Sequence, residues 1–526
     1  MDRAAQIDAA LAAGDIAGAV ALSRAALLAG DRDPFACNLV AWADIEAGKA
    51  VEGETLVRRG LALAPDDPGL LTTLGLALRR QSRLREALAA YDAAIALAPD
   101  YAVAWLERGF ALHQGNSLQL AAQSYGRAAT LDPGQAAAFA GLAAIASTQG
   151  EGAEARRFAS QALARDPRDA VAHCAIARAD IADGATSAAA ARLQTLLGDP
   201  ALNLDNRSAA LSLLGDALAK TGDPQGAHDA WAAAKASLPD RFPQMAAAEP
   251  LVAMVARIDV AVLAGPAQFT APGTAETRNH AFLLGYPRSG TTLVETILAS
   301  ADGVATLEEL PTLLAAETRF YLPADGAAAL AALDAETADD LRAAYWQRVA
   351  DFGVVADARL FVDMDPLKTM DLPLIGRLFP AATVIVMRRD PRDVMLSCFR
   401  QNFAASPIAF EFTTLARAAR HYDALMRLQR HSLKRMANPV FELRYEELVA
   451  DFDGVTQRLC AALGLEWQEA LRDFSATARQ RNVSTASVGQ VRRGLYNGSG
   501  QWQRFAAQLQ PVLPLLQSWI DDFGYV

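Results

Sequence analysis

The sequence predicts an α + α/β protein, with an all-helical repeat region followed by an α/β domain whose parallel sheet is flanked by helices. Two observations predict this division. Prolines recur at a fixed spacing of 34 residues, at Pro65, Pro99, Pro133 and Pro167. A period of this length is typical of stacked helical repeats. In the second half, short apolar runs are each followed by a polar turn and a helical stretch, as expected of buried parallel strands.

Composition limits the classes of partner. The 526 residues are 52% apolar, which suffices for several cores, and 49 basic against 60 acidic side chains give a net charge of −11. This balance does not favour binding to nucleic acid or to an anionic membrane surface. The first residues, MDRAAQIDAALAAGD, lack the apolar segment of a secretory signal, and no apolar run is long enough to span a bilayer.

The cysteines are scattered and show no CxxC spacing. This pattern predicts neither a disulfide framework nor a metal site, and it favours reduced thiols in the cytoplasm. The four residues are Cys37, Cys174, Cys398 and Cys460. We therefore expect a cytoplasmic protein with no bound metal and no membrane span.

Each repeat carries the same small and aromatic residues. In the unit that begins at Pro68, Gly75 and Ala87 let two helices approach, and Tyr91 fills the gap between them. The equivalent residues are Gly109, Ala121, Tyr125 and Ala128 in the next unit, and Gly215, Ala227, Trp231, Ala234 and Pro239 in the final one. These residues resemble the tetratricopeptide repeat, a helix–turn–helix unit. The resemblance implies a solenoid whose concave groove binds a protein or peptide.

These patterns divide the chain into three parts. Residues 1–241 are expected to form the tetratricopeptide solenoid, and residues 281–526 the α/β domain. Between them, residues 242–280 are expected to contain one capping helix, from about Met245 to Leu263, and a linker rich in turn-forming residues.

The α/β domain opens with a candidate phosphate-binding turn. An apolar run from Ala281 to Tyr286 leads into the turn PRSGTT and then into the helical stretch LVETILAS. Strand, tight turn and helix together direct backbone N–H groups and a helix N-terminus at an anion. Arg288 adds a cation, and the remaining donors are Ser289, Gly290, Thr291 and Thr292. The GxxxxGK[ST] pattern of triphosphate loops is absent, which disfavours an ordinary kinase without eliminating it.

A second candidate phosphate site lies about one hundred residues later. The apolar run from Ala382 to Met387 ends in RRDPRD and a helix, and Arg389 and Ser397 are eight residues apart. A turn at the strand end can bring both side chains to one phosphate.

The two segments together resemble sulfotransferases that use 3′-phosphoadenosine 5′-phosphosulfate (PAPS). PRSGTT is similar to their 5′-phosphosulfate loop, and Arg389 with Ser397 to their 3′-phosphate element. FELRY and the later STASVGQVRRGLYNGSGQW resemble further segments of tyrosylprotein sulfotransferases. That likeness implies nucleotide contacts from Tyr445 and from Ser487, with Arg492 or Arg493 adding charge.

The resemblance also implies a catalytic base. Glu309 is the second acid of the pair in TLEELP and lies 21 residues after Arg288, the spacing of the base in tyrosylprotein sulfotransferases. Two alternatives stay open: Glu308 is the base, or both acids cap a helix that begins near Pro311. The resemblance makes Glu309 and Arg288 the catalytic candidates.

Two positions depart from the family pattern. Met364 stands where a lysine usually steadies the bridging oxygen, and Lys368 is a candidate replacement four residues on. Gln501 precedes Trp502, where a basic residue is common.

The function implied is PAPS-dependent transfer of a sulfuryl group to a hydroxyl acceptor. The acceptor would be a tyrosine or another protein side chain presented by the repeats. The alternative is a tetratricopeptide scaffold whose sulfotransferase domain binds the nucleotide but is inactive.

Overall fold

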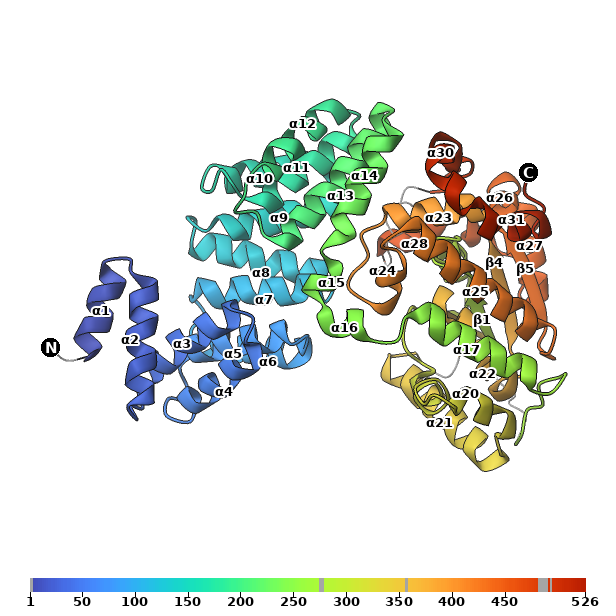
Figure 1. Ribbon diagram of the computed structural model, residues 1–526, viewed down its shortest axis with the longest axis horizontal. Helices are drawn as coiled ribbons and strands as arrows, with labels where there is room; N and C mark the ends of the chain where they lie inside the picture. Colours follow the sequence, from blue (N-terminus) through green and yellow to red (C-terminus); the bar gives the residue numbers. More distant parts are fainter. Residues whose placement is uncertain (1–2, 274–278, 355–357, 481–490, 492–493) are drawn as a thin grey trace. The chain divides into compact units, whose positions relative to one another are not determined.

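The chain forms two compact units, Met1–Asp199 and Pro200–Val526. A computed structural model describes residues 3–273, 279–354, 358–480, 491 and 494–526 (Figure 1). The second unit therefore contains the last helical pair that carries the repeat pattern as well as the α/β domain. The boundaries at residues 241 and 280 stay predictions.

The first unit is a stack of antiparallel helix pairs, which confirms the predicted helical repeat. Neighbouring helices follow one another from blue to teal in Figure 1, joined by short turns. Its helices are α1 (Arg3–Ala12), α2 (Ile16–Leu28), α3 (Pro34–Glu46), α4 (Ala50–Leu61), α5 (Pro68–Arg80), α6 (Leu84–Leu97), α7 (Ala102–Gln114), α8 (Leu118–Leu131), α9 (Ala136–Gln149), α10 (Gly152–Leu163), α11 (Ala170–Ala182) and α12 (Thr186–Leu197).

The aromatic side chain of each repeat fills the space beside a glycine. Tyr125 on α8 is fully buried between Gly109 on α7 and Gly141 on α9. A Cβ atom added at either glycine would lie 2.6 Å from the Tyr125 ring. Glycine is therefore required at both positions by close packing, and this agrees with the role that the sequence pattern predicts.

The second unit contains a five-stranded parallel sheet in the order β2-β3-β1-β4-β5. The strands are β1 (His280–Leu284), β2 (Val304–Glu308), β3 (Leu360–Met364), β4 (Thr383–Arg388) and β5 (Val440–Arg444). The predicted α/β fold class is confirmed. The two apolar runs singled out in the sequence are β1 and β4, displaced by one or two residues from the predicted bounds.

Both faces of the sheet are buried. Along β1, Phe282 and Leu284 belong to one apolar core, and Ala281 and Leu283 belong to the other. All four side chains have no exposed surface. This is why β1 reads as a continuous apolar run and does not alternate with polar residues.

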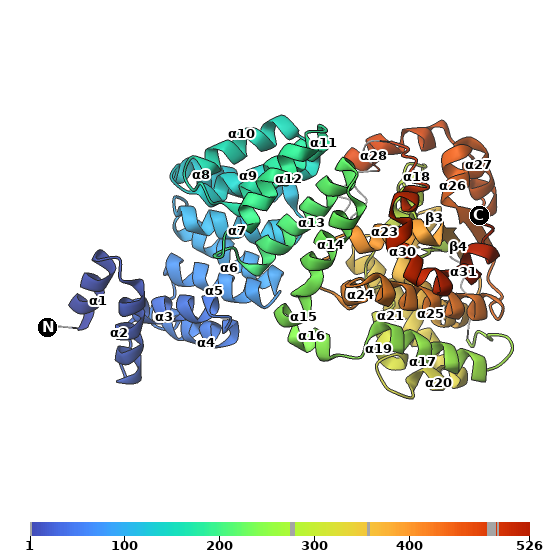
Figure 2. The same ribbon diagram turned by 45° about the horizontal axis from the view of Figure 1, so that its top comes forward.

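Helices cover the two faces of the sheet (Figure 2). The α-helices of this unit are α13 (Leu204–Thr221), α14 (Pro224–Ala236), α15 (Leu238–Arg241), α16 (Pro243–Ala247), α17 (Leu251–Ala264), α18 (Thr291–Leu298), α19 (Leu314–Phe320), α20 (Gly326–Ala329), α21 (Ala335–Asp351), α22 (Leu372–Leu378), α23 (Pro391–Arg400), α24 (Pro407–Glu411), α25 (Leu415–Leu433), α26 (Tyr445–Ala450), α27 (Phe452–Ala462), α28 (Phe474–Gln480), α30 (Ala506–Leu509) and α31 (Leu513–Asp522). Short 3₁₀ helices are η1 (Leu330–Ala332), η2 (Pro366–Asp371), η3 (Glu469–Asp473), η4 (Gln501–Phe505) and η5 (Gln510–Val512).

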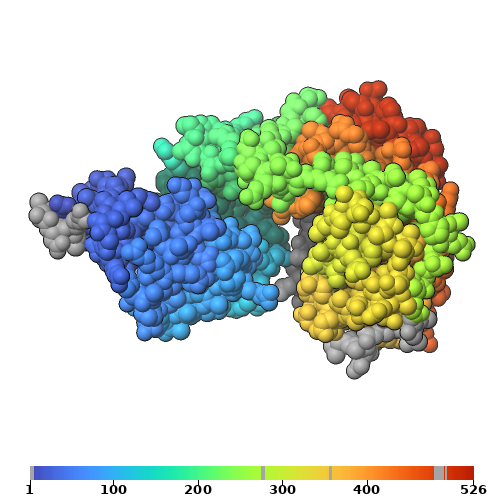
Figure 3. Space-filling view, turned by 60° about the horizontal axis from the view of Figure 1, so that its bottom comes forward, coloured from blue at the N-terminus to red at the C-terminus, as the bar shows by residue number. Residues whose placement is uncertain are grey.

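The segment predicted as one helix from Met245 to Leu263 is divided into α16 and α17. Pro250 lies between them and has extended backbone. A proline also disfavours helical conformation at the residue before it, so the helix cannot continue through this point. α17 buries Val255 and Ile258 in the core that it shares with α25. Figure 3 shows α17, in light green, alongside the yellow segment that includes α20.

In the part of the chain that the structure describes, no helix has both the length and the apolar character needed to cross a membrane.

Two glycines of neighbouring repeat helices provide a matched test of the packing. Gly109→Ala should lower the free energy of unfolding by about 1–3 kcal/mol, because its Cβ would overlap the ring of Tyr125. Gly126→Ala, on α8, meets no atom within 4 Å and should raise it by up to about 1 kcal/mol through helix propensity. Urea unfolding followed by circular dichroism measures both changes. Equal effects of the two substitutions would contradict this description of the repeat.

Candidate functional site

The carboxyl ends of the strands bring the candidate residues to one edge of the sheet. The chain leaves β1 for α18, β4 for α23 and β5 for α26. The strand order places β3 on one side of β1 and β4 on the other. Ligands of open parallel sheets bind beyond the carboxyl ends, at the point where the strand order reverses. Here that point lies between β1 and β4.

The turn after β1 has a left-handed backbone. Arg288 has a φ of 71° and Gly290 a φ of 112°. A side chain at Gly290 would also lie 2.9 Å from the nearest atoms of Met387 and Tyr445. α18 begins at Thr291, so the first N–H groups of an eight-residue helix start directly after the turn. The local geometry is that of an anion-binding turn.

The two candidate phosphate elements meet through their side chains. The Arg288 Nε donates a hydrogen bond to Ser397 Oγ at 3.1 Å. The Arg389 Nη1 donates to the carbonyl oxygen of Arg288 at 3.0 Å. The structure therefore brings Arg288 together with two residues that lie more than one hundred positions later in the sequence.

A pocket that is partly open to solvent lies at this junction. Its lining residues are Arg288, Gly290, Thr292, Leu293, Arg389, Asp393, Leu396, Ser397, Arg400, Tyr445, Val491, Gly494, Tyr496, Gly498 and Gln501.

The pocket is rich in positive charge. Burial lowers the pKa of Arg288 to about 10, and the neighbouring Arg389 and Arg400 act in the same direction. Asp393 is the acid in the described lining, and its carboxylate is already hydrogen-bonded to backbone N–H groups. Among the residues that the structure describes, the buried Nε of Arg389 has no hydrogen-bond partner. Such a pocket can accept a polyanion.

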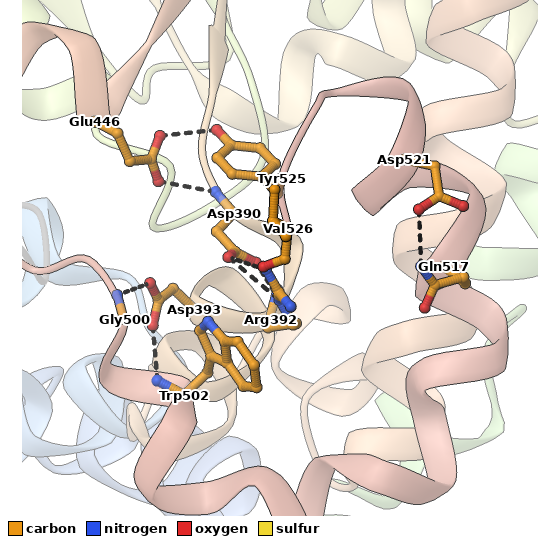
Figure 4. Close-up of polar contacts among 10 residues, drawn as sticks. All are labelled: Asp390, Arg392, Asp393, Glu446, Gly500, Trp502, Gln517, Asp521, Tyr525 and Val526. Carbon is orange, nitrogen blue, oxygen red and sulfur yellow. Dashed lines mark hydrogen bonds and ion pairs between the residues drawn. The ribbon is translucent and has the colours of Figure 1, made fainter.

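Arg389 is the arginine of the RRDPRD segment that lines the pocket. Arg388 is paired with Glu442 at 2.7 Å. Arg392 is paired with Asp390 at 2.8 Å, as Figure 4 shows. The two neighbouring guanidinium groups are therefore held by carboxylates on the protein.

A C-terminal segment forms part of the pocket. Tyr445 donates a hydrogen bond to the carbonyl oxygen of Tyr496 and accepts one from the Gly498 N–H at 3.3 Å. Arg389 lies over the Tyr445 ring, with its guanidinium carbon 4.7 Å from the ring centroid, and donates to the Gly498 carbonyl at 2.6 Å. This part of the C-terminal segment therefore lies against Arg389 and Tyr445.

Asp393 fixes the next part of that segment. Its carboxylate accepts hydrogen bonds from the N–H groups of Gly500 at 2.7 Å and Trp502 at 2.9 Å (Figure 4). Asp393 was not predicted as a site residue, because an acidic residue in a basic segment is usually an ion-pair partner of its neighbours. Arg400 and Tyr496 were not predicted either. Arg400 lies in no motif, and Tyr496 lies in the C-terminal segment, where the residues singled out are Ser487, Arg492 and Arg493.

Glu309 directly follows β2 and is not among the described lining residues of the pocket. Its φ is 51°, and its N–H donates to the Met364 carbonyl at 2.7 Å. The side chain is accessible to solvent. The surrounding protein, Asp365 and Glu308 raise the pKa of Glu309 to about 7, while Arg288 opposes this rise. A carboxylate with this pKa is suited to proton transfer near neutral pH.

Lys368, the candidate replacement for the missing lysine, forms an ion pair within the protein. Its buried ammonium group lies 2.5 Å from Asp363 Oδ1 and donates to the Leu310 carbonyl at 2.9 Å. Met364, at the expected lysine position, is fully buried in β3. Lys368 therefore contacts the backbone next to Glu309 and is not among the described lining residues of the pocket.

The other predicted site residues differ in placement. Thr292 lines the pocket, whereas Thr291 is buried beside it. Ser289 is 1% exposed, and its Oγ faces Gly285, where an added Cβ would lie 2.6 Å away. Ser487 lies outside the described residues, as do Arg492 and Arg493.

Comparison with known proteins finds a match in each half of the chain. Residues 281–469 match the sulfotransferase family, and residues 75–116 match the TPR repeat. An uncharacterized protein of Aquifex aeolicus is 32% identical over 249 residues. The aligned region covers 45% of this chain and only 32% of that relative. The family match indicates a sulfotransferase-type function for the second half.

Solved structures similar to this chain are tetratricopeptide proteins. A repeat protein of Parabacteroides merdae is 16% identical, with a TM-score of 0.35, and the match covers 44% of this chain and 90% of that one. A TPR protein of Thermus thermophilus is 21% identical, with a TM-score of 0.31, over 34% of this chain and 98% of that one.

The Tyr445 hydroxyl offers a test of how the C-terminal segment is held. Tyr445→Phe keeps the ring beneath Arg389 but removes the contacts to Tyr496 and Gly498. The free energy of unfolding should fall by about 0.5–1.5 kcal/mol. Amide hydrogen exchange of residues 494–500 should accelerate. Unchanged exchange in this segment would contradict the proposed anchoring.

Proposed function

We propose that the C-terminal half transfers the sulfuryl group of PAPS to a hydroxyl acceptor. The observation that carries the proposal is the convergence of Arg288 and Arg389 on one pocket, from the ends of adjacent parallel strands. A nucleotide with anionic groups at both its 5′ and 3′ positions needs two separate cationic elements at a fixed distance. The match to the sulfotransferase family supports this choice of nucleotide.

The chain's own residues have distinct roles in holding the donor. The turn at Arg288 and the first N–H groups of α18 would hold the 5′ end. Arg389 and Ser397 would hold the 3′-phosphate, since both side chains line the pocket. Tyr445 would lie beside the nucleotide, since it lines the same pocket. When bound, PAPS supplies the sulfuryl group and the leaving phosphate.

Glu309 is proposed as the base. It would accept the proton that the acceptor hydroxyl loses as its oxygen bonds to sulfur. Arg288 would stabilise the charge that develops on the leaving phosphate oxygen. Their positions support this assignment, because Arg288 follows β1 and Glu309 follows β2, and both turns lie at the carboxyl edge of the same parallel sheet. The protein acts mainly by positioning and by charge stabilisation.

The first half is proposed to bind a protein or peptide in its groove and to present the acceptor side chain. The match to the TPR repeat supports a role in protein interaction. The acceptor would then be a tyrosine or another hydroxyl side chain of that partner. We keep the cytoplasm as the expected location and no metal as the expected cofactor requirement.

One observation favours the second candidate, a scaffold that binds nucleotide without turnover. Lys368, the candidate substitute for the lysine missing at Met364, is held by Asp363. If the bridging oxygen requires a lysine, the domain would bind the donor and not react. Transfer assays separate these two functions.

Calorimetry tests the identity of the nucleotide. The chain should bind 3′-phosphoadenosine 5′-phosphate, the product of PAPS, more tightly than ATP with Mg²⁺. The reason is that the pocket offers cations at two strand ends and the turn lacks the lysine of triphosphate loops. Preference for ATP with Mg²⁺ would support a kinase and overturn the proposal.

Replacement of Glu309 tests the catalytic role. Glu309→Gln should lower transfer by about 10²–10⁴-fold while nucleotide affinity stays within a few-fold, because the amide cannot accept a proton. Glu308→Gln is the matched control and should lose much less. Transfer measured from labelled PAPS checks both variants.

The pH dependence of transfer provides a second test of Glu309 as the base. Because partial desolvation by the surrounding protein and the nearby carboxylates raise the pKa of Glu309 to about 7, the base is protonated below that pH. Transfer by the parent should therefore rise about tenfold per pH unit up to about 7 and then level off. Parent-like transfer in Glu309→Gln would reject Glu309 as the base.

A further inference from the structure

The last helical pair carries the repeat pattern but belongs to the same compact unit as the sulfotransferase domain. Trp231 on α14 occupies the position of Tyr91 and Tyr125 in earlier repeats. A Cβ at Gly215 on α13 would lie 2.4 Å from its ring, so the glycine–aromatic packing of the repeat is kept. The larger indole also extends beyond the helical pair.

Trp231 reaches the core of the α/β domain. Its ring lies 6.5 Å from that of Phe399, edge to face, and 5.4 Å from that of Phe505. His228, one turn earlier on α14, lies with its ring 5.1 Å from Phe399. Figures 1 and 2 show α14 beside α23, the helix that carries Phe399. The final repeat is therefore packed onto the helix of the candidate 3′-phosphate element.

A buried lysine on α14 contacts the end of that helix. Lys235 is 6% exposed, and its ammonium group donates a hydrogen bond to the Phe399 carbonyl oxygen. It also lies 5.0 Å from the centroid of the Phe399 ring. The last carbonyl groups of a helix lack partners within the helix, and a cation there is stabilising. Lys235, which belongs to the last helical pair with the repeat pattern, thus caps the C-terminus of α23 in the α/β domain.

The same turn of α23 lines the candidate nucleotide pocket. Ser397 accepts the hydrogen bond from Arg288, and Arg400 lines the pocket. Arg400 is itself held by α13 and α14: it donates to Asp216 at 3.2 Å, and its guanidinium carbon lies 5.7 Å from the Trp231 ring. Contacts of the final repeat and contacts of the pocket therefore share one helical turn.

We propose that α13 and α14 are a structural part of the donor site, and that Lys235 is a positioning residue that acts through the last turn of α23. Lys235 itself is not a lining residue of the pocket. The predicted effect on nucleotide affinity rests on the proposed function. The claim that Lys235 orders the turn from Ser397 to Arg400 does not depend on any ligand.

Lys235→Met in the full chain tests the proposal, because it keeps most of the apolar stem and removes the donor. Hydrogen exchange in the peptide of residues 396–403 should accelerate at least about tenfold, and exchange in β1 should not change. Affinity for 3′-phosphoadenosine 5′-phosphate should fall about tenfold, since displacement of the turn misaligns two pocket side chains. In a Ser397→Ala background, the further loss of affinity caused by Lys235→Met should shrink, because the effect runs through that turn.

Lys220→Met is the matched control. Lys220 lies on α13 and is exposed, and the same substitution there should leave both measurements at the parent values. If Lys235→Met does not fold, Asp216→Asn provides a second variant. It removes the charge that holds Arg400 at the surface, where such a pair contributes little to stability. It should raise exchange in the same peptide and weaken nucleotide binding by a smaller factor.

Two outcomes would overturn the inference. One is parent-like exchange at residues 396–403 in the folded Lys235→Met or Asp216→Asn variant. The other is accelerated exchange with unchanged nucleotide affinity. A parent chain that binds no 3′-phosphoadenosine 5′-phosphate would instead refute the proposed function, and the exchange measurement would still decide whether Lys235 orders the turn.

Discussion

The parallel pairing of β1 with β4 is the constraint on which the candidate site depends. The register pairs Leu284 with Val386, so both strands end at the same edge of the sheet. The turns that follow then leave side by side, and the hydrogen bond from Arg288 to Ser397 joins them. Strands in antiparallel order would place these turns at opposite edges. The sheet therefore supplies the spacing between the two cationic elements.

Two residues of the site have a strained backbone that the neighbouring structure must hold. Arg288 and Glu309 both have positive φ, which costs about 1–3 kcal/mol for a residue other than glycine. Arg389 contacts the carbonyl of Arg288, and the Met364 carbonyl accepts the N–H of Glu309. In the described parts of the chain, the other non-glycine residues with positive φ are Ser82 and Asn116, each in a turn between repeat helices.

Local patterns predicted much of the fold because they reflect local physics. The 34-residue period predicted the helix pairs, since each glycine must accommodate a neighbouring ring. The apolar runs predicted β1 and β4, since both faces of the sheet are buried. The turn motifs predicted that Arg389 and Ser397 can reach one phosphate and that Arg288 holds the other end of the same nucleotide; in the structure all three line one pocket.

Contacts between distant segments could not be predicted from the sequence. The hydrogen bonds that the Asp393 carboxylate accepts from the N–H groups of Gly500 and Trp502 join segments about 110 residues apart. No sequence motif indicates them. The contact of Lys235 with Phe399 is more distant still. Lys368 was a candidate to replace the missing lysine because it is close to Met364 in the sequence. In the structure it instead forms an ion pair with Asp363, the residue before Met364 in β3.

The most direct test of the central claim is a thermodynamic cycle on the 3′-phosphate. Calorimetry would compare 3′-phosphoadenosine 5′-phosphate with adenosine 5′-phosphate, in the parent chain and in Arg389→Ala. The account predicts that the parent prefers the 3′-phosphorylated nucleotide by about 10- to 150-fold, the value of a charge-assisted contact. In Arg389→Ala the preference should fall to within about threefold. A preference that survives intact in Arg389→Ala, or that is missing in the parent, would contradict the claim that the ends of β1 and β4 hold one bisphosphorylated nucleotide.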